Sequence, residues 1–367
     1  MKLRLLGQRT NLGGGILFSH LVDALRNVYF PENIVEEVDL FDDPQVERAV
    51  RSATAQDINI WIWPDDRVEL LKGTQIVWAM FESDRLPRHY LRSLNADFDL
   101  VWVPSSWGRD VLITNGVAAE RIDIVPLGVD ANAFHTYLRR STERSSLFRF
   151  LAVGKFEKRK GYYELLQAFT EAFGNSAAVE LVIKADYFLD LENKRTAFSE
   201  MVATFGISNV RLMEGNWSRE QLFGLYSCCD AFVFPSRSEA WGLPAIEAVA
   251  SGLPIIATFY SGHTEFLQYI DSSLFKISTT LLPIDDPEYQ RYWPSDDGDY
   301  GRWAQPSIAS IAEGLTVTQQ RNSNLADAAL KSSLLIRERF SWTAAANKAL
   351  DHLKRRGFIP LAFKFPG

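Results

Sequence analysis

Short apolar, β-branched runs recur along this chain, and segments with helical periodicity separate them. This alternation is typical of an α/β protein with parallel sheets. The runs form two series: Lys2–Leu6, Ile34–Asp39, Asn59–Trp63, Gln75–Met80, Leu100–Val103 and Ile122–Val125, then Phe148–Val153, Glu180–Lys184, Asn209–Met213, Asp230–Phe234, Ile255–Thr258 and Leu274–Ile277. Two sheets, each with its own first strand, predict two Rossmann-like domains facing across a cleft. Ligands of such sheets bind at the carboxyl ends of the strands.

A polar segment, His135–Ser146, lies between the two series and is interpreted as a linker because it has no apolar period. We expect an N-terminal domain over residues 1–140, a C-terminal domain over 147–340, and a final helix and tail over 341–367 that crosses back to the N-terminal domain. The region Pro283–Ser307, rich in Asp, Pro, Tyr and Trp, predicts an irregular surface excursion. The last predicted helices are Ile308–Gln319 and Trp342–Lys354, followed by the apolar tail Phe358–Phe365.

The composition excludes several classes of protein. A hydrophobic content of 47% with 23% charged residues is that of an ordinary globular protein. The formal net charge of −7 argues against a dedicated nucleic-acid binder. The cysteines are the neighbours Cys228 and Cys229, so a disulfide framework is not expected. Neither a signal peptide nor an apolar run of about 20 residues is present. We therefore expect a cytoplasmic protein, and a peripheral contact at the inner face of the membrane stays open.

The most informative segment is Pro235–Pro254, which holds two carboxylates, Glu239 and Glu247, with a helix start between them. Pro244 suits the first turn of that helix, because its missing N–H would have no partner there. A helix N-terminus at the carboxyl edge of a sheet offers free N–H groups and a partial positive charge to a phosphate. Glu247, about one turn into the helix, leans back toward the same point.

Three other segments are compatible with phosphate chemistry. The cluster Asn11–Ile16 brings glycines to a helix start, but it lacks the G-x-G-x-x-G fingerprint, and a merely tight turn explains it equally well. The loop Gly154–Gly161 carries four cations; alone it is read more readily as a solvated loop, but Lys155 and Lys160 abut the glycines and are better phosphate candidates than Lys158 and Arg159. The segment Met213–Ser218 could offer backbone groups to a nucleobase.

Together these motifs resemble glycosyltransferase family 4, the glycosyl transferases group 1. The resemblance rests on Gly154-Lys-Phe-x3-Lys-Gly161, on Gly215-Asn-Trp-Ser218, on Tyr226-x3-Asp-Ala-Phe-Val-Phe-Pro-Ser-Arg-Ser-Glu-x7-Glu247 and on Ser261-Gly-His-Thr-Glu265. A first-domain match from Ser105 to Asp130 and the closing Phe340-Ser-Trp342 extend it over nearly the whole chain. It implies the GT-B fold and a retaining transfer from a nucleotide sugar, with UDP- or GDP-sugars favoured.

The resemblance also implies roles for individual residues. Glu239 would touch the donor sugar, Glu247 would hold the ribose hydroxyls, and Lys160 matches the diphosphate lysine of the family. Lys155 stands where the family usually has arginine, so its charge is kept and the bidentate fork is lost. The catalytic candidates are Glu239, Lys155 and Lys160, and the donor-binding candidates are Gly14, Gly15, Gly215, Asn216, Trp241, Gly242, Leu243, Pro244 and Glu247. Glu82 occupies the place of a family histidine and is an acceptor-side candidate.

No metal or other cofactor is expected, because the D-x-D sequences at Asp97 and Asp297 do not follow suitable strands. His263 is read as a donor contact or, equally, as a surface residue, and Arg85, Arg88 and Arg92 as a solvated helix face.

The acceptor class stays open between a glycan, a lipid-linked glycan and a small molecule. Two alternatives remain: a nucleotide-sugar-binding protein that is inactive alone or needs a partner, and, less favoured, a nicotinamide-dependent oxidoreductase.

Overall fold

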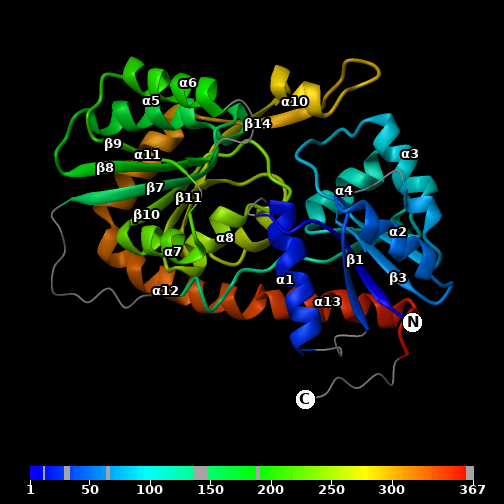
Figure 1. The fold of residues 1–367 in the computed structure, drawn as a ribbon. Helices are drawn as coiled ribbons and strands as arrows, with labels where there is room; N and C mark the ends of the chain where they lie inside the picture. Colours follow the sequence, from blue (N-terminus) through cyan, green and yellow to red (C-terminus); the bar gives the residue numbers. More distant parts are fainter. Residues whose placement is uncertain are drawn as a thin grey trace. The chain divides into compact units, whose positions relative to one another are not determined.

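All twelve predicted strands are present, and they form two six-stranded parallel sheets (Figure 1). The computed structural model describes residues 1–10, 13–28, 34–62, 67–135, 147–186, 191–215 and 217–360. Most of the predicted linker, most of the apolar tail and Asn216 lie outside these residues. The chain divides into unit 1, which comprises Met1–Gly128, Trp293–Tyr300 and Phe340–Gly367, and unit 2, which comprises Val129–Tyr292 and Gly301–Arg339. The division falls after Gly128, earlier than the limit expected at residue 140.

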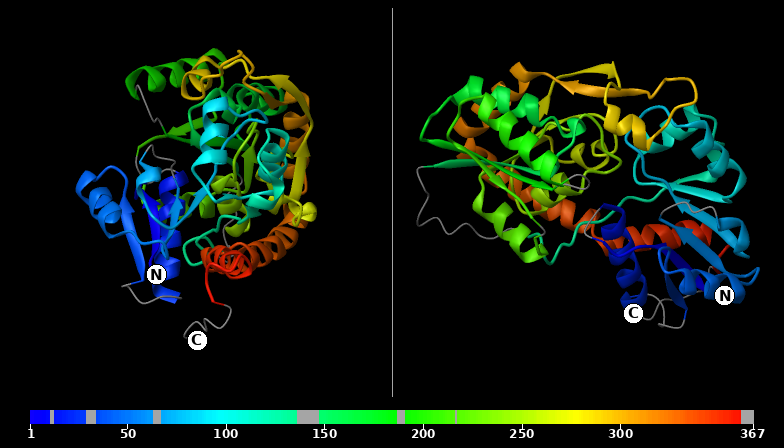
Figure 2. Two further views of the ribbon diagram at one scale, coloured as in Figure 1. Left: turned by 90° about the vertical axis from the view of Figure 1, so that its right-hand side faces the viewer. Right: turned by 45° about the horizontal axis from the view of Figure 1, so that its top comes forward.

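Unit 1 contains a sheet in the order β2-β1-β3-β4-β5-β6. Its helices cover both faces of this sheet (Figures 1 and 2). The strands are β1 Leu3–Gly7, β2 Val35–Asp39, β3 Ile58–Trp61, β4 Thr74–Trp78, β5 Leu100–Val103 and β6 Ile122–Ile124; the helices are α1 Gly13–Val28, α2 Asp43–Ser52, α3 Arg88–Ala96, α4 Ser106–Thr114 and α13 Trp342–Arg355, with short 3-10 turns η1 Val68–Leu70 and η2 Ala119–Arg121.

Unit 2 contains the second parallel sheet, in the order β12-β11-β10-β7-β8-β9, and a two-stranded antiparallel ribbon, β13-β14. The strands are β7 Phe148–Lys155, β8 Val179–Asp186, β9 Val210–Met213, β10 Ala231–Phe234, β11 Ile255–Thr258, β12 Leu274–Ile277, β13 Thr279–Pro283 and β14 Arg302–Pro306. The helices are α5 Tyr162–Phe173, α6 Leu191–Thr204, α7 Arg219–Cys228, α8 Leu243–Ala250, α9 Thr264–Leu267, α10 Pro287–Tyr292, α11 Ile308–Gln320 and α12 Asn322–Arg339, with 3-10 turns η3 Lys158–Lys160 and η4 Asp271–Ser273.

The strand order of unit 2 fixes where its functional loops meet. β7 is the first strand of this unit in sequence, yet it lies in the middle of the sheet, between β10 and β8. The chain therefore builds one half of the sheet outward from β7 through β8 and β9, then returns to the other side of β7 with β10. Ligands of open α/β sheets bind at such a reversal, outside the carboxyl ends of the strands. The loops after Lys155 and Phe234 start at this point.

The two parallel sheets are held by burial on both faces. All four residues of β10 and all four of β11 are buried, as expected for continuous apolar strands between two layers of helices. On one face of the unit 2 sheet, side chains of β7 and β8 pack with those of α5 and α11 in one cluster. This core leaves the loops at the carboxyl edge as the place where polar side chains gather.

In the second half of the chain one prediction was wrong and one helix was missed. The excursion Pro283–Ser307 is not irregular: it contains α10, and β14 pairs with β13 so that Leu281 lies opposite Ala304. Helix α12 was not predicted at all. Its buried positions are Ala329, Ser332, Ser333 and Ile336 among the described residues, whereas Leu334 is 56% exposed, so most of its leucines do not mark its buried face.

The segment Trp293–Tyr300 belongs to unit 1, where its Asp297 pairs with two arginines of that unit. Arg85 Nη2 donates to Asp297 Oδ2 at 2.7 Å, and Arg88 lies 3.6 Å from the same oxygen. Ser83 donates to the carbonyl of Tyr300 at 2.6 Å. Arg85, Arg88 and Arg92 are all exposed, as expected for a solvated face, and the first two also pair with Asp297.

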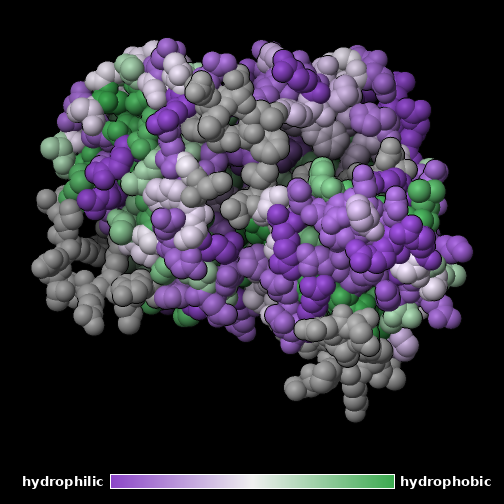
Figure 3. Space-filling model, viewed as in Figure 1, coloured by the Kyte–Doolittle hydropathy of each residue, from purple (hydrophilic) through white to green (hydrophobic). Residues whose placement is uncertain are grey.

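Hydrophilic residues predominate on the molecular face drawn in Figure 3, and hydrophobic residues occur there in small groups. Among the helices of the described residues, none is both long enough and apolar enough to cross a membrane.

Candidate active site

The loops that follow β7 and β10 pack directly against each other. After β7 the chain makes the 3-10 turn η3 and then turns at Gly161, whose φ of 70° lies in the left-handed region. A Cβ at Gly161 would lie 2.5 Å from the carbonyl oxygen of Pro235, so only glycine allows this approach. Arg237 N–H donates to the carbonyl of Arg159 at 2.8 Å and completes the junction. The local sequence therefore brings the cations of the first loop to the carboxylate of the second.

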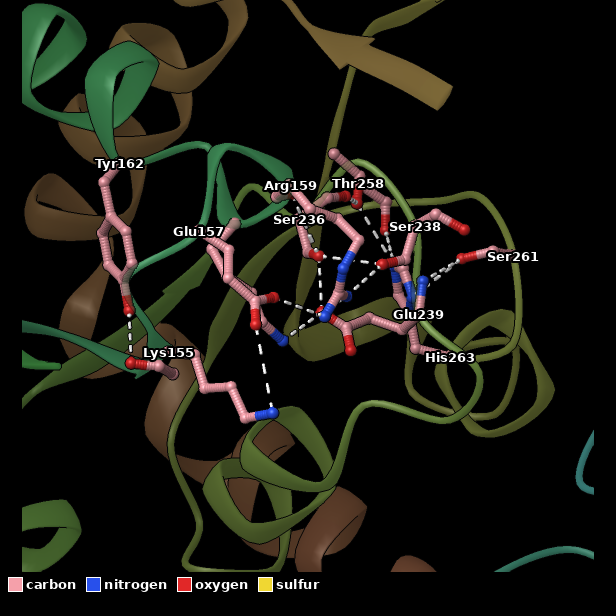
Figure 4. Close-up of polar contacts among 12 residues, drawn as sticks. Lys155, Glu157, Arg159, Tyr162, Ser236, Ser238, Glu239, Thr258, Ser261 and His263 are labelled. Atoms are coloured by element: carbon pink, nitrogen blue, oxygen red, sulfur yellow. Dashed lines mark hydrogen bonds and ion pairs between the residues drawn. The ribbon is translucent and has the colours of Figure 1, made fainter. Parts of the chain in front are cut away.

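Glu239 lies at the centre of this junction and is 6% exposed (Figure 4). Lys160 Nζ and Ser236 Oγ each donate to its Oε1 at 2.5 Å. Arg159 Nη1 lies 3.0 Å from the same oxygen. Among the described residues, none bonds to the second carboxylate oxygen, Oε2. The arrangement thus fixes Glu239 through one oxygen and leaves the other available to a ligand.

The ionisation of Glu239 follows from these contacts. Burial by itself would raise the pKa of Glu239, but the positive charges of Arg159 and Lys160, with the hydrogen bonds from Lys160 and Ser236, hold it at about 2. Burial also lowers the pKa of the Lys160 ammonium, and Glu239 opposes that effect. Glu239 is therefore a permanent anion between two cations at neutral pH.

A second layer of hydrogen bonds holds the Glu239 loop in place. Glu239 N–H donates to Ser261 Oγ at 2.8 Å, and Ser261 has a φ of 66°, a strained value for a residue with a side chain. His263 Nε2 donates to the carbonyl of Thr258 at 2.9 Å, and Thr258 Oγ1 donates to the carbonyl of Ser236 at 2.5 Å. Burial lowers the pKa of His263 to about 4, so it is neutral. With no exposed surface, His263 is not a surface residue.

Glu247 has a different environment, although it is equally buried. Tyr226 donates its hydroxyl to Glu247 Oε2 at 3.3 Å, and Arg219 Nη2 lies 3.8 Å from Oε1. Arg219 also lies 3.6 Å from Asp130 and over the ring of Phe134, so its charge is shared. Burial raises the pKa of Glu247 to about 7, and the weak contacts with Arg219 and Tyr226 only partly oppose it. The two carboxylates of the motif thus differ strongly in proton affinity.

This difference predicts a pH-dependent stability that belongs to Glu247. Because its folded pKa of about 7 lies above its ordinary value of 4.5, the folded state holds the proton more tightly. The contribution of Glu247 to the free energy of unfolding is then greatest below pH 4.5. It declines as the pH rises toward 7 and beyond, by up to about 3 kcal/mol. Glu247→Gln cannot titrate, so its free energy of unfolding relative to wild type should rise between pH 5 and pH 8.

Urea unfolding of both proteins at several pH values measures this difference, in which all other titrating groups cancel. Glu200→Gln, on the exposed side of α6, is the matched control and should follow the wild type. Parallel curves for wild type and Glu247→Gln would show that Glu247 ionises as an ordinary carboxyl.

The start of α8 lies between the two carboxylates in sequence. Gly242 precedes the helix with a φ of 92°, and Leu243 and Pro244 form its first turn, both partly exposed. The proline needs no hydrogen-bond acceptor at this position, and no side chain caps the helix. Lys155, at the end of β7, is 33% exposed and 3.9 Å from Glu157. Each of these predicted residues is thus placed at the carboxyl edge of the unit 2 sheet.

The other predicted residues are described by their position and burial. The Trp241 side chain is buried against Phe266, so we expect its backbone and not its indole to face a ligand. Gly215 is exposed after β9, with a φ of 94°. In unit 1, Gly14 and Gly15 lie at the start of α1, and a Cβ at Gly15 would collide with Thr10. Glu82 is half-buried after β4, also in unit 1.

Sequence reasoning assigned Arg159 no role beyond a weaker phosphate candidate. The structure places it beside Glu239, with 8% of its surface exposed. Lys158, by contrast, points away and lies 3.9 Å from Asp285. Nothing in the loop composition separates these neighbours, because all four cations share one short segment.

No group of three or more His, Cys, Asp or Glu side chains suited to a metal occurs in the part of the chain that the structure describes. In the two D-x-D sequences, Asp99 accepts the N–H of Gln75 at 2.7 Å, and Asp297 pairs with Arg85.

Comparison with known proteins gives a consistent result. Residues 136–270 match the family model of the glycosyl transferases group 1. The chain is 30% identical over 164 residues to the MMP alpha-(1->4)-mannosyltransferase of Mycolicibacterium hassiacum, covering 44% of this chain and 36% of that protein. It is 29% identical over 188 residues to the mannosylfructose-phosphate synthase of Agrobacterium fabrum, covering 48% and 41%. The chain thus spans about two-fifths of the length of these curated relatives.

Solved structures match over almost the whole chain. Anabaena Alr3699/HepE, solved in complex with UDP and glucose, superposes with a TM-score of 0.71 at 14% identity, over 97% of this chain and all of that one. WaaG, described as a glycosyltransferase involved in lipopolysaccharide biosynthesis, gives a TM-score of 0.63 at 14% identity, over 95% and 99%. These similarities establish the fold, two Rossmann-like units with parallel sheets. Residues 136–270 thus match the family model of the glycosyl transferases group 1, in a chain with the GT-B fold.

Proposed function

We propose that this protein is a retaining, metal-independent glycosyltransferase that moves a sugar from a nucleotide sugar to an acceptor hydroxyl. The observation that carries the proposal is the pairing of Glu239 with Lys160 and Arg159 at the strand-order reversal of unit 2. Helix α8 begins four residues after Glu239, so an anion-binding helix start follows directly in the chain. A buried anion beside cations and a helix start suits a donor whose sugar is joined to a diphosphate.

Each part of the donor has a candidate partner. The diphosphate would bind the start of α8 at Leu243 and Pro244, together with Lys155 and Lys160. The open oxygen of Glu239 would accept a hydroxyl of the donor sugar. Glu247, next to the hydroxyl of Tyr226, would accept the ribose hydroxyls. The loop at Gly215 would face the base.

In the proposed reaction the bond between the anomeric carbon and the diphosphate oxygen breaks as the acceptor oxygen bonds to the same face of that carbon. The departing diphosphate takes the proton of the acceptor hydroxyl. Lys155, Lys160 and the N–H groups of α8 stabilise its growing negative charge, and Glu239 stabilises the positive charge that develops on the sugar.

The ionisation of the carboxylates argues against a hydrolase. Glycosidases need one carboxylic acid that protonates the leaving group and a second carboxylate on the other side of the bond. Glu239, with a pKa of about 2, carries no proton to give at neutral pH. Glu247 holds a proton more readily, but Tyr226 and Arg219 engage its two oxygens, as suits a binding residue.

The donor is a UDP-sugar or a GDP-sugar, and the UDP-sugar is the one supported by a protein of the same fold solved with UDP and glucose. The names of the relatives describe mannosyl transfer and sugar-phosphate synthesis. The acceptor in this protein is a glycan, a lipid-linked glycan or a small molecule.

Thermal unfolding in the presence of UDP-, GDP-, ADP- and TDP-sugars tests the proposal. One nucleotide class should raise the melting temperature, because a ligand at a hundred times its Kd stabilises by about 2.7 kcal/mol. Glu247→Ala should abolish that shift, and Glu200→Ala should retain it. The proposal fails if no nucleotide sugar shifts the transition of the wild type, or if the shift survives in Glu247→Ala.

A further inference from the structure

Arg159 connects the two loops of the site through several contacts, of which the ion pair with Glu239 is only one (Figure 4). Its Nη1 donates to the carbonyl of Ser238 at 2.6 Å and lies 3.0 Å from Glu239 Oε1. Its Nη2 donates to Glu157 Oε2 at 2.9 Å. Its own carbonyl accepts the N–H of Arg237. One residue thus holds the carboxylate, the backbone next to it and the acid of its own loop.

Lys160 competes with Arg159 for the same carboxylate oxygen. Both cations reach Glu239 Oε1, and Lys160 does so at 2.5 Å with its side chain 9% exposed. A diphosphate that binds Lys160 must draw the ammonium away from this contact, at least in part. If Lys160 were the sole counter-ion of Glu239, its withdrawal would leave a buried carboxylate unpaired, which is costly.

We infer that Arg159 is a positioning residue that holds Glu239 independently of Lys160, so that Lys160 is free to bind the β-phosphate of a nucleoside diphosphate. The inference rests on the proposed function and deepens it. The guanidinium suits this task because its planar fork donates to Ser238 and Glu157 and pairs with Glu239 at once, whereas an ammonium is a point charge. Arg159 itself is already engaged by these partners and does not need to touch the diphosphate.

Binding of UDP and UMP, and of GDP and GMP, separates this role from a general effect on the loop. The wild type should bind the diphosphate of its preferred base more tightly than the monophosphate. In Arg159→Met, Glu239 retains Lys160 as its remaining cation, so diphosphate affinity should fall about tenfold while monophosphate affinity changes less than twofold. Lys158→Met removes the neighbouring cation, which points to Asp285, and should change neither.

A double-mutant cycle tests whether Arg159 acts through Lys160. Lys160→Met should lower the diphosphate affinity. The double variant Arg159→Met/Lys160→Met should bind the diphosphate no more weakly than Lys160→Met alone, because Arg159 affects the diphosphate only through Lys160. Additive losses would overturn the inference, as would an equal loss of monophosphate and diphosphate in Arg159→Met.

The outcomes also separate this inference from the proposed function. If the wild type binds no nucleotide, the proposed function fails. If the wild type prefers the diphosphate and Arg159→Met keeps that preference, only the role of Arg159 fails. Should Arg159→Met not fold, Arg159→Lys decides the question: it retains a charge but cannot bond three partners at once, and it should lose at least threefold in diphosphate affinity with monophosphate affinity unchanged. An unchanged preference in that variant would overturn the inference.

Discussion

Glu239→Gln is expected to lower the rate of sugar transfer by about 10²- to 10³-fold. The amide keeps the shape of the side chain but removes the negative charge that would face the developing positive charge on the donor sugar. Nucleotide affinity should not fall, because the neutral amide would hold the Lys160 ammonium more weakly and leave it to the diphosphate. The measurement is kcat for transfer together with the Kd of the nucleoside diphosphate.

Glu200→Gln, which changes an exposed glutamate on α6, is the control for the chemical change alone and should transfer at the wild-type rate. Thermal unfolding of both variants confirms that the fold is retained. Equal losses of transfer and nucleotide binding in Glu239→Gln would contradict a role at the reacting centre, because they would place Glu239 on the nucleotide.

Gly262→Ala should be the most destabilising glycine-to-alanine substitution in the site. A Cβ at Gly262 would lie 1.8 Å from the carbonyl oxygen of Ala240, far inside contact distance. The Glu239 loop cannot give way freely, since Gly262 N–H donates to the carbonyl of Glu239 at 2.8 Å and Ser261 accepts the Glu239 N–H. We expect a loss of about 3 kcal/mol or more in stability, and a loss of transfer, measured by chemical unfolding and by activity.

Gly224→Ala is the matched control for this substitution. Gly224 lies within α7, and apart from its chain neighbours and the backbone of its own helix no atom lies within 4 Å of the place its Cβ would take. Replacing glycine by alanine there should be neutral or stabilise by up to about 1 kcal/mol. A Gly262→Ala protein as stable and active as Gly224→Ala would mean that the Ser261–His263 turn adapts, and that it does not position Glu239.

The strand predictions succeeded where local sequence and tertiary environment agree. Asp230–Phe234 and Ile255–Thr258 are apolar because both faces of their sheet are covered, so the burial that stabilises them is visible in the residues themselves. The start of α8 between Glu239 and Glu247 was equally predictable, because Pro244 suits a first helical turn through its backbone alone.

The sequence did not indicate α12, because its described buried residues, Ala329, Ser332, Ser333 and Ile336, include only one large apolar side chain. Ser333 donates to the carbonyl of Ala250, and Ser332 lies 2.7 Å from Ser273, so serines and Ala329 let α12 approach its neighbours in the fold closely. Leu334 is on the outside. Which face of such a helix is buried depends on what packs against it, and that partner is not encoded in the local period.

By itself, the sequence determined the two parallel sheets, the position of the β7 and β10 loops at their carboxyl edge, and the presence of Glu239, Glu247 and Lys160 in or beside those loops. The tertiary structure alone decided the chemistry of these groups. Lys160 and Glu239 are 79 residues apart, and only the strand order of unit 2 makes them partners. Burial acts on both glutamates, yet two close cations hold the pKa of Glu239 at about 2, while a distant, shared Arg219 leaves that of Glu247 at about 7. A side chain's charge is set by the distances to its neighbours, and those distances exist only in the fold.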